Sequence, residues 1–223
     1  MVPLVQQFKI SFQVIPVHEW SEEVLSNELD LLDLRWIEGG LEVNLKILDS
    51  LKGTFKTAHP GRIISSAEDL PTCFAQKICV KQLYWQGAAR RSISHYRGNE
   101  EYRKLVKEII CLDWATILLD LTYKFIEVAV AEYDEPHGGI PKLQFVRMML
   151  ARDIQNDKHF LVEEWLGESF GFIKYINNGH PVSCVRVGAP KEDHQIAEFL
   201  CFAQHVQYNQ TDGLAYTSDY QGL

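Results

Sequence analysis

The sequence lacks paired cysteines and long uninterrupted apolar stretches. Its five cysteines are odd in number, and no two of them form a C-x-x-C pair. We therefore expect them to fill small core positions in a reducing compartment. No apolar run reaches membrane-spanning length without a charge, and the N-terminus lacks the basic start and small-residue cleavage site of a signal peptide. These absences favour an intracellular, cytoplasmic protein with no membrane partner.

A strongly basic surface is also missing. The 223 residues include 22 lysines and arginines against 30 aspartates and glutamates, which gives a formal net charge of -8 and an isoelectric point near 5.5. Neutralising a nucleic-acid backbone needs an electropositive face, so this balance argues against nucleic acid as the main partner. With 46% hydrophobic and 23% charged residues, the chain can bury a core in one large domain or two small lobes.

The sequence does contain alternating segments and one long helical pattern. VNLKIL (43–48) and KICVKQLYW (77–85) alternate apolar and polar positions as half-buried strands do. Residues 100–130 repeat apolar positions at helical spacing and are apolar almost all round, so this helix must be largely buried. KLQFVRMMLARD (142–153) suggests another helical turn or two, and residues 194–208 predict a helix with one apolar face. This order indicates an α+β protein of two lobes.

Glycine and lysine positions in the first half could carry chemistry. Gly53 and Gly61 bracket GTFKTAHPG between two strands, where glycine would let a backbone close over phosphates. An ordinary hairpin is the alternative, because turn glycines are common. Lys81 lies among apolar residues in KICVKQLY and could reach phosphate oxygens as a point charge, or extend its ammonium into solvent instead.

Two further features lie near the end of the sequence. Asp219 and Gln221 in SDYQG come where a strand runs into a turn, and two oxygen donors at this spacing can share Mg2+. Turn capping by the aspartate is the alternative. His205 could be a metal ligand or could simply pack on its helix. In chain order, these features match a two-lobed ATP phosphotransferase, which must cover the phosphates, counter them with a cation and bridge them with Mg2+.

Several blocks of the sequence resemble the alpha-kinase family, the atypical protein kinases that include myosin heavy chain kinases and elongation-factor-2 kinase. The blocks are GTFKTAHPG, ICVKQ, VEEWLGESFGFIKYINNG, IAEFLCFAQHVQY and SDYQG. The sequence is most similar to the expanded fungal branch of the family. The resemblance covers roughly residues 45–223, and FIKYINN and EFLCFAQH are its most specific parts. The resemblance implies an α+β, two-lobed atypical protein-kinase-like (alpha-kinase) fold with an incomplete second lobe.

The resemblance also implies domain boundaries. Residues 1–42 match nothing in the family and are expected to form an N-terminal extension that packs on the first lobe or on a partner. The alpha-kinase-like domain is expected at 43–223, divided into an N-lobe at about 43–162, a hinge at 163–167 and a partial C-lobe at 168–223.

ATP-binding roles in the first lobe follow from the same resemblance. Gly53 and Lys56 match the glycine loop and its following basic residue, and Lys81 matches the phosphate-contacting, catalytic lysine. Glu163 and Trp165 match the adenine-binding hinge. A kinase fold also requires a carboxylate partner for the lysine, for which the helical region offers only weak candidates: Glu101, Glu108 and Asp113.

Roles in the second lobe are implied in the same way. Asp219 and Gln221 match the first half of the catalytic Asp-x-Gln-Gly segment, with Asp219 as a catalytic residue and both as Mg2+ ligands. His205 matches the first of the family's structural zinc ligands. The Lys-Tyr-x-Asn-Asn block after the hinge is matched by Lys174, Tyr175, Asn177 and Asn178.

The sequence departs from the family after SDYQG. The family continues with a Thr-Asp-Pro segment, the remaining zinc ligands and a glycine-rich loop, whereas this sequence stops at Leu223. A structural zinc site needs about four protein ligands. We therefore expect a truncated domain with ATP and Mg2+ as cofactors, no bound zinc, and slow or absent phosphate transfer.

The expected function is an ATP-dependent serine/threonine protein kinase of the alpha-kinase type. A non-catalytic pseudokinase, or a nucleotide- or protein-binding module with the same fold, is the main alternative. An unrelated α+β binding protein is a further one. The sequence does not predict the substrate protein or the oligomeric state.

Overall fold

The computed structural model describes residues 5–14, 36–45, 53, 55–66, 70–86, 93–134, 136, 138–167 and 172–222. Strands and helices are mixed along the chain, which confirms the α+β class. The chain divides into two compact units. The first comprises Met1–Cys111 and Val146–Trp165, and the second comprises Leu112–Phe145 and Leu166–Leu223.

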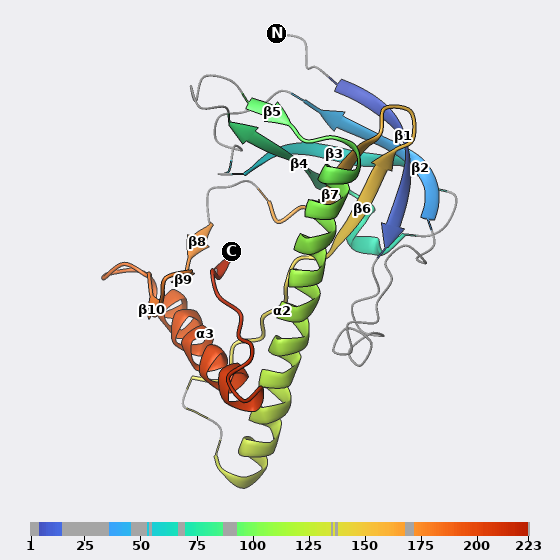
Figure 1. Ribbon diagram of the computed structural model, residues 1–223. Helices are drawn as coiled ribbons and strands as arrows, with labels where there is room; N and C mark the ends of the chain where they lie inside the picture. Colours follow the sequence, from blue (N-terminus) through green and yellow to red (C-terminus); the bar gives the residue numbers. More distant parts are fainter. Residues whose placement is uncertain are drawn as a thin grey trace. The chain divides into compact units, whose positions relative to one another are not determined.

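The first unit is built mainly of antiparallel strands, drawn from blue to green and in gold in Figure 1. Its strands are β1 (Val5–Val14), β2 (Trp36–Asn44), β3 (Lys56–Ser66), β4 (Lys77–Gln86), β5 (Ile93–His95), β6 (Met148–Asp153) and β7 (Lys158–Glu164). A short 3-10 helix, η3 (Thr72–Phe74), precedes β4. Helix α2 (Gly98–Glu132) contributes its residues up to Cys111 to this unit.

Strand pairing in the first unit closes on itself. The sheet order is β3-β2-β1-β6-β7-β4-β5, and β3 also pairs with β4, so six strands form a ring and β5 adds to its edge. Side chains alternate between the two faces of each strand, and the inward ones fill the ring. The resulting core comprises Ile10, Phe12, Leu41, Val43, Phe74, Ile78, Val80, Met149, Ala151, Phe160 and Val162.

The start of α2 covers the outer face of β7 (Figure 1). Leu161 faces out from the ring yet is fully buried, as are Leu105 and Ile109 on α2. The Glu101 carboxylate on α2 accepts a hydrogen bond from the His159 backbone N–H on β7 at 2.7 Å. Burial on both faces explains why the three central residues of β7, Phe160, Leu161 and Val162, are consecutively apolar instead of alternating with polar ones.

Strands β1 and β2 are integral to the ring. β1 pairs with β2 over Val5↔Asn44 to Gln13↔Trp36, and its second half pairs with β6. The boundary expected at residue 42 therefore falls inside β2, and β1 occupies part of the expected N-terminal extension. The predicted strand at 43–48 lies at the end of β2, and residues 46–48 are outside the described ones.

Most of the expected glycine loop GTFKTAHPG is strand, because β3 begins at Lys56. A Cβ atom on Gly61 would lie 2.8 Å from the Glu42 carbonyl oxygen and 2.9 Å from Val80 Cγ2, so glycine is required there for close strand packing. Pro60 pairs with β4 but lies just past the pairing with β2, where a missing N–H is tolerated. Gly61 therefore lies in a strand, where its lack of a side chain permits close packing.

The helical turn expected within residues 142–153 is wrong. Residues 141–147 have no regular structure, and Met148–Asp153 form β6, which pairs with both β1 and β7. The sequence MMLARD has good helix formers, but two neighbouring strands supply its hydrogen bonds and tertiary pairing overrides the local preference.

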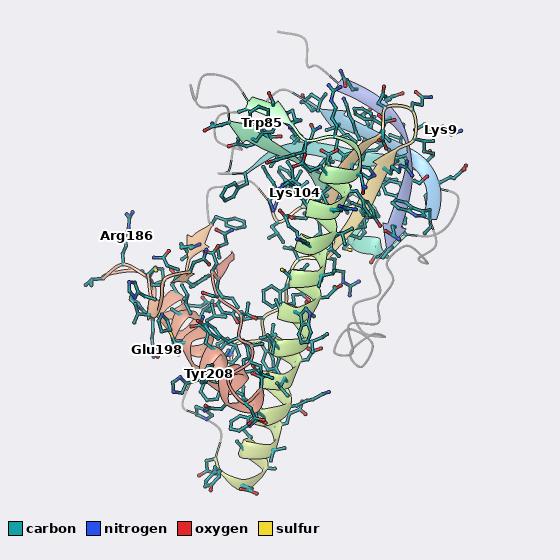
Figure 2. All side chains as sticks on the ribbon, in the orientation of Figure 1. Lys9, Trp85, Lys104, Arg186, Glu198 and Tyr208 are labelled. Atoms are coloured by element: carbon teal, nitrogen blue, oxygen red, sulfur yellow. The ribbon has the colours of Figure 1, made fainter. Side chains whose placement is uncertain are left out.

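The predicted long helix is confirmed as α2, but it is not buried all round. Phe125 and Val128 are 39% and 66% exposed near its C-terminal end. Nearer its start, Lys104, labelled in Figure 2, places its ammonium nitrogen 4.7 Å from the Tyr96 ring centroid. None of the described helices combines the length and hydropathy that a membrane crossing requires.

The second unit combines the rest of α2 with α3 (Lys191–Gln210) and four short strands. The strands are β8 (Ile173–Lys174), β9 (Ile176–Asn177), β10 (His180–Ser183) and β11 (Gln221–Gly222), paired as β8 with β11 and β9 with β10. α3 confirms the helix predicted at 194–208, and its apolar face is covered: Phe199, Ala203 and Val206 are all buried. The core of this unit comprises Leu119, Ile126, Tyr175, Ile176, Ala197, Phe199, Leu200 and Tyr220.

Candidate functional site

The outer face of β4 and β7 in the first unit carries an ion pair. Lys81 lies opposite Leu161, and Cys79 lies opposite Glu163, in the antiparallel register of the two strands. The Lys81 ammonium is 2.5 Å from a Glu163 carboxylate oxygen, and the two side chains are 27% and 9% exposed. Because neighbouring strands place both side chains on one face, the sheet itself fixes where the charges lie.

Glu163 is thus the partner of Lys81, although sequence reasoning placed it at the adenine and considered only helical carboxylates for the pairing. Glu108 on α2 instead pairs with Lys56 of β3, at 2.6 Å between Nζ and Oε2. Glu101 is bonded to the His159 backbone. The signal that could have identified Glu163 is the strand register, which local sequence does not contain.

Cys79 lies within the field of these charges. Burial raises the pKa of its thiol to about 11; the positive charges of Lys81 and Lys56 oppose that rise, and the Glu163 carboxylate adds to it. The two lysines and the carboxylate therefore lie close enough to one sulfur atom to influence its ionisation. The thiol stays protonated at neutral pH and is a poor nucleophile.

A tight turn precedes β3 at the predicted glycine position. The Gly53 N–H donates to the Lys56 carbonyl at 2.9 Å, and the Tyr84 hydroxyl on β4 donates to the Gly53 carbonyl at 2.5 Å. The Tyr84 N–H donates to the Phe55 carbonyl at 3.0 Å. The turn is therefore anchored to β4, on which Lys81 also lies. Phe55, which is 70% exposed, projects into solvent.

The predicted hinge residues lie at the end of β7. The division between the two units falls between Trp165 and Leu166, inside the range expected for the hinge. The Lys77 ammonium lies 3.7 Å from the centroid of the Trp165 ring, a cation–π contact. The Glu164 carboxylate accepts a hydrogen bond from the Arg147 N–H at 3.0 Å. These contacts hold the segment up to Trp165 on the first unit.

In the second unit, Lys174 and Asp219 form an ion pair. They are 36% and 42% exposed, and Lys174 lies opposite Gln221 where β8 pairs with β11. Asp219 has a φ of 63°, in the left-handed region that aspartate tolerates better than most residues. The Tyr175 N–H donates to the Tyr220 carbonyl at 2.9 Å, which fixes the two short strands together.

The remaining residues of the Lys-Tyr-x-Asn-Asn block divide between core and surface. Tyr175 is buried, and burial raises the pKa of its hydroxyl, with the charges of Asp193 and Glu192 contributing in the same direction. Asn177 and Asn178 are exposed, in β9 and in the turn that follows it. The Ser218 hydroxyl donates to the Asn177 carbonyl at 3.2 Å, so the block also contacts the segment that carries Asp219.

Two glutamines on α3, which sequence reasoning missed, hold the segment before Asp219. The Gln204 amide donates to the Thr217 carbonyl at 2.8 Å, and the Thr217 N–H donates to the Gln207 side-chain oxygen at 2.8 Å. The Gln207 amide also donates to the Thr122 hydroxyl on α2 at 3.3 Å. Two buried amides three residues apart on an apolar helix face were the available signal.

The fold was compared with those of solved structures. An alpha kinase from Entamoeba histolytica matches 100% of the chain, with 74% of its own length covered, a TM-score of 0.65 and 15% identity. The inactive alpha-kinase domain of myosin heavy chain kinase A, in complex with ATP, matches 100% of the chain, with 81% of its own length covered, a TM-score of 0.53 and 12% identity. This chain has the alpha-kinase fold. The same kinase domain in complex with AMP-PNP gives a TM-score of 0.53 at 14% identity, covering 100% of the chain and 80% of that domain.

The alpha-kinase fold is therefore established by structure alone. The sequence matches no protein-family model and no curated protein. Within this alpha-kinase fold the predicted site residues fall into two groups. The first unit holds Gly53, Lys56, Lys81, Glu163 and Trp165, and the second holds Lys174, His205, Asp219 and Gln221.

The described residues of this alpha-kinase fold contain no group of three or more His, Cys, Asp and Glu side chains that could hold a metal ion. His205, which the sequence resemblance matched to a zinc ligand, is exposed on α3. Asp219 and Gln221 supply a carboxylate and an amide oxygen, donors that suit Mg2+ because it keeps several waters and takes few protein ligands.

Proposed function

We propose that this chain belongs to the alpha-kinase family and is an ATP-dependent kinase that transfers the γ-phosphate to serine or threonine of a protein. Glu163 and Trp165 would bind near the adenine, with the turn at Gly53 and Lys56 near the phosphates. Lys81 would contact the phosphates, and Asp219 with Gln221 would bind Mg2+. The ion supplies charge neutralisation for the transferring phosphoryl group.

The Lys81–Glu163 pair carries the proposal. In the alpha-kinase fold, a lysine on a central strand has its ammonium 2.5 Å from a carboxylate of the strand that leads into the hinge. A cation held in this way is oriented before ligand arrives, and preorganised charge is what phosphoryl transfer requires. Structures with the same fold include complexes with ATP and AMP-PNP.

Calorimetric titration of the chain with Mg-ATP tests this assignment. Lys81→Ala removes a charge-assisted contact and is expected to weaken binding roughly tenfold to a hundredfold. Lys9→Ala is the matched control, because Lys9 is an exposed strand lysine of the same sheet. Equal affinity of wild type and Lys81→Ala would remove Lys81 from the nucleotide site.

A non-catalytic nucleotide-binding module is the second candidate. It is favoured by Asp219, whose carboxylate is already paired with Lys174 and which belongs to no acidic cluster among the described residues. Incorporation of labelled phosphate into a basic protein separates the two functions. Incorporation that Lys81→Ala abolishes supports the kinase, whereas nucleotide binding without incorporation supports the module.

A further inference from the structure

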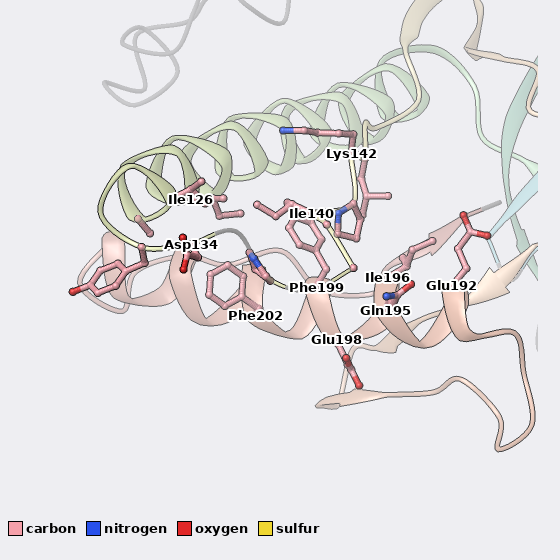
Figure 3. A pocket seen from close by; sticks show the side chains of 18 residues that line it. Ile126, Asp134, Ile140, Lys142, Glu192, Gln195, Ile196, Glu198, Phe199 and Phe202 are labelled. Carbon is pink, nitrogen blue, oxygen red and sulfur yellow. The ribbon is translucent and has the colours of Figure 1, made fainter.

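A groove lies in the second unit, and its lining includes none of the residues assigned to the nucleotide. Its volume is about 660 Å³, within the range of about 300–1,000 Å³ that ligand sites occupy. Figure 3 shows that its walls come from the end of α2, from α3 and from the segment between α2 and β6. The lining includes Ile126, Ala129, Val130 and Tyr133 on one side and Glu192, Gln195, Ile196, Glu198, Phe199 and Phe202 on the other.

Both walls follow the helical repeat, which makes the groove elongated. The lining positions of α2 and of the residue just beyond it recur every three or four residues, and those of α3 do the same, so each helix presents one continuous face. From Glu192 to Phe202 the wall covers eleven residues, whose ten steps span about 15 Å at the rise of an α-helix. A groove of this length fits roughly three turns of a second helix.

The segment between α2 and β6 closes the floor of the groove. Gly138 has a φ of 108°, and a Cβ there would lie 2.8 Å from the Gln195 side-chain nitrogen, so glycine lets the segment approach α3 closely. The Tyr123 hydroxyl donates to the Pro141 carbonyl at 2.9 Å and accepts from the Leu143 N–H at 2.7 Å. The floor is thus hydrogen-bonded to α2 and lies close against α3 before any partner binds.

Apolar side chains in this region remain exposed. Phe202 is 43% exposed and Val130 is 36% exposed, and the Phe202 ring lies 6.4 Å from that of Phe125, which is itself 39% exposed. Apolar groups gathered in a groove and rimmed by charge mark an interaction surface better than scattered ones do. Burying Phe202 beneath a partner would add favourable apolar contact.

The rim of the groove is acidic. Among the residues that the structure describes, the charged ones of the lining are Asp134, Glu192 and Glu198 and the cation Lys142, whose ammonium lies 4.9 Å from the Tyr123 ring centroid. The last turn of α2 contains no basic residue, so its negative dipole end is not offset locally. The charge of the rim therefore complements a basic partner.

The carboxylates lie along the groove instead of converging. Figure 3 shows Asp134 and Glu192 toward opposite ends, and Glu198 at an intermediate position along α3, on the side of that helix that faces away from α2. Small ligands are fixed by a few convergent polar groups, whereas an amphipathic helix places its apolar face in a groove and its charges along the rims. A second copy of this chain would bring the same acidic rim and meet like charges.

We propose that this groove binds a basic amphipathic helix of a partner protein. The apolar face of that helix packs on Phe199 and Phe202, and its lysines or arginines face Asp134, Glu192 and Glu198. The groove shares no lining residue with the set assigned to the nucleotide, so it provides a docking position for a protein partner. It does not depend on whether the chain transfers phosphate.

Fluorescence anisotropy of the full chain with labelled synthetic peptides tests the proposal. The probe is an amphipathic peptide of roughly three helical turns, with leucines at helical spacing and lysines elsewhere. Its controls are a scrambled peptide of the same composition and a peptide with glutamates in place of the lysines. Saturable binding of the probe alone, which weakens as salt is raised, is the expected result.

Two substitutions locate the binding to this groove. Phe202→Ala is expected to raise the Kd about fivefold to thirtyfold, because it removes a buried aromatic anchor, and Glu198→Lys about threefold to tenfold. Their matched controls are Leu214→Ala, an exposed apolar residue of the same unit, and Glu127→Lys, an exposed helical glutamate outside the lining. Both controls are expected to bind the probe as wild type does.

Three outcomes would overturn the proposal. They are equal binding of the probe and the scrambled peptide, binding unchanged by both Phe202→Ala and Glu198→Lys, and a dimer in sedimentation that Phe202→Ala dissociates. The last result would assign the groove to a second copy of the chain. Circular dichroism of each variant establishes that it is folded, so a loss of binding can be assigned to the groove.

Discussion

The two units of the alpha-kinase fold hold their candidate charges in different ways. In the first unit, Lys81 and Glu163 project from adjacent long strands of a closed ring, and the carboxylate is almost buried. In the second, Lys174 and Asp219 lie at two-residue strands, and both are more than a third exposed. The candidate residues of the first unit are therefore preorganised by a sheet, whereas those of the second unit depend on side-chain hydrogen bonds from α3.

The largest expected effect comes from the hydrophobic core of the first unit, on which the Lys81–Glu163 pair depends. Phe160→Ala removes a ring that is 2% exposed inside the strand ring, and it is expected to lower the free energy of unfolding by about 3–5 kcal/mol. Urea unfolding followed by circular dichroism measures the loss. Phe55→Ala, at a 70% exposed position of the same unit, is the control and should change little. Equal losses from both would mean that the ring is not the stabilising core.

The next effect compares buried carboxyls of α2, one in each unit. Burial raises the pKa of Glu101 to about 7 and that of Asp113 to about 6. Each group keeps its proton to a higher pH in the folded than in the unfolded chain, so its contribution to stability is greatest at low pH. That contribution falls as pH rises from about 4.5 to 7 for Glu101 and from about 3.8 to 6 for Asp113, by up to about 3 kcal/mol each.

Urea unfolding measured at several pH values checks these windows. Glu101→Gln should remove the fall in the free energy of unfolding across the upper pH window, that of Glu101. Asp113→Asn should remove the fall across the lower one, that of Asp113, because neither amide titrates. Glu100→Gln, at the exposed neighbouring position, serves as the control and should follow wild type. A fall in the free energy of unfolding that survives in Glu101→Gln would assign the upper window to another group. His159 would not explain it, because burial lowers the pKa of that imidazole and its contribution to stability rises with pH.

The third effect is the contribution of the Lys81–Glu163 ion pair to the free energy of unfolding. Lys81→Ala leaves the Glu163 carboxylate buried without its cation, and it should lower the free energy of unfolding by about 1–3 kcal/mol. Adding Glu163→Gln should restore part of that loss, because the uncompensated charge is removed as well. Unfolding in urea of wild type, both single variants and the double variant gives the coupling energy. A double variant whose loss equals the sum of the single losses would mean the pair is not coupled.

Long periodic elements could be predicted from the sequence. The helix expected at 100–130 is α2, and the strand expected at 77–85 lies within β4, because their apolar repeats extend over enough residues to identify the period. Elements whose structure depends on pairing within the ring of strands could not be predicted. Residues 148–153 have helical character but become β6, because β1 and β7 on either side supply its pairing.

The candidate site shows the same limit. Lys81 could be found because it interrupts an apolar alternation, but its partner Glu163 comes from the register of β4 on β7, which is a non-local property. Gln204 and Gln207 fasten the segment before Asp219 by contacts across a gap of at least ten residues. The functional roles of all these residues remain predictions.

The smallest expected effect belongs to the second pair. Lys174→Ala removes an ion pair whose members are 36% and 42% exposed, and such pairs contribute about 0–1 kcal/mol because water screens them. The difference from wild type in urea unfolding should shrink further as the ionic strength is raised. Lys124→Ala, at an exposed helical lysine of the same unit, is the control and should show no salt-dependent difference. Suppose that Lys174→Ala lowers the free energy of unfolding as much as Lys81→Ala does, and that salt does not change this loss. The Lys174–Asp219 pair would then be held as firmly as the Lys81–Glu163 pair, and long strands would not be needed to orient the charges.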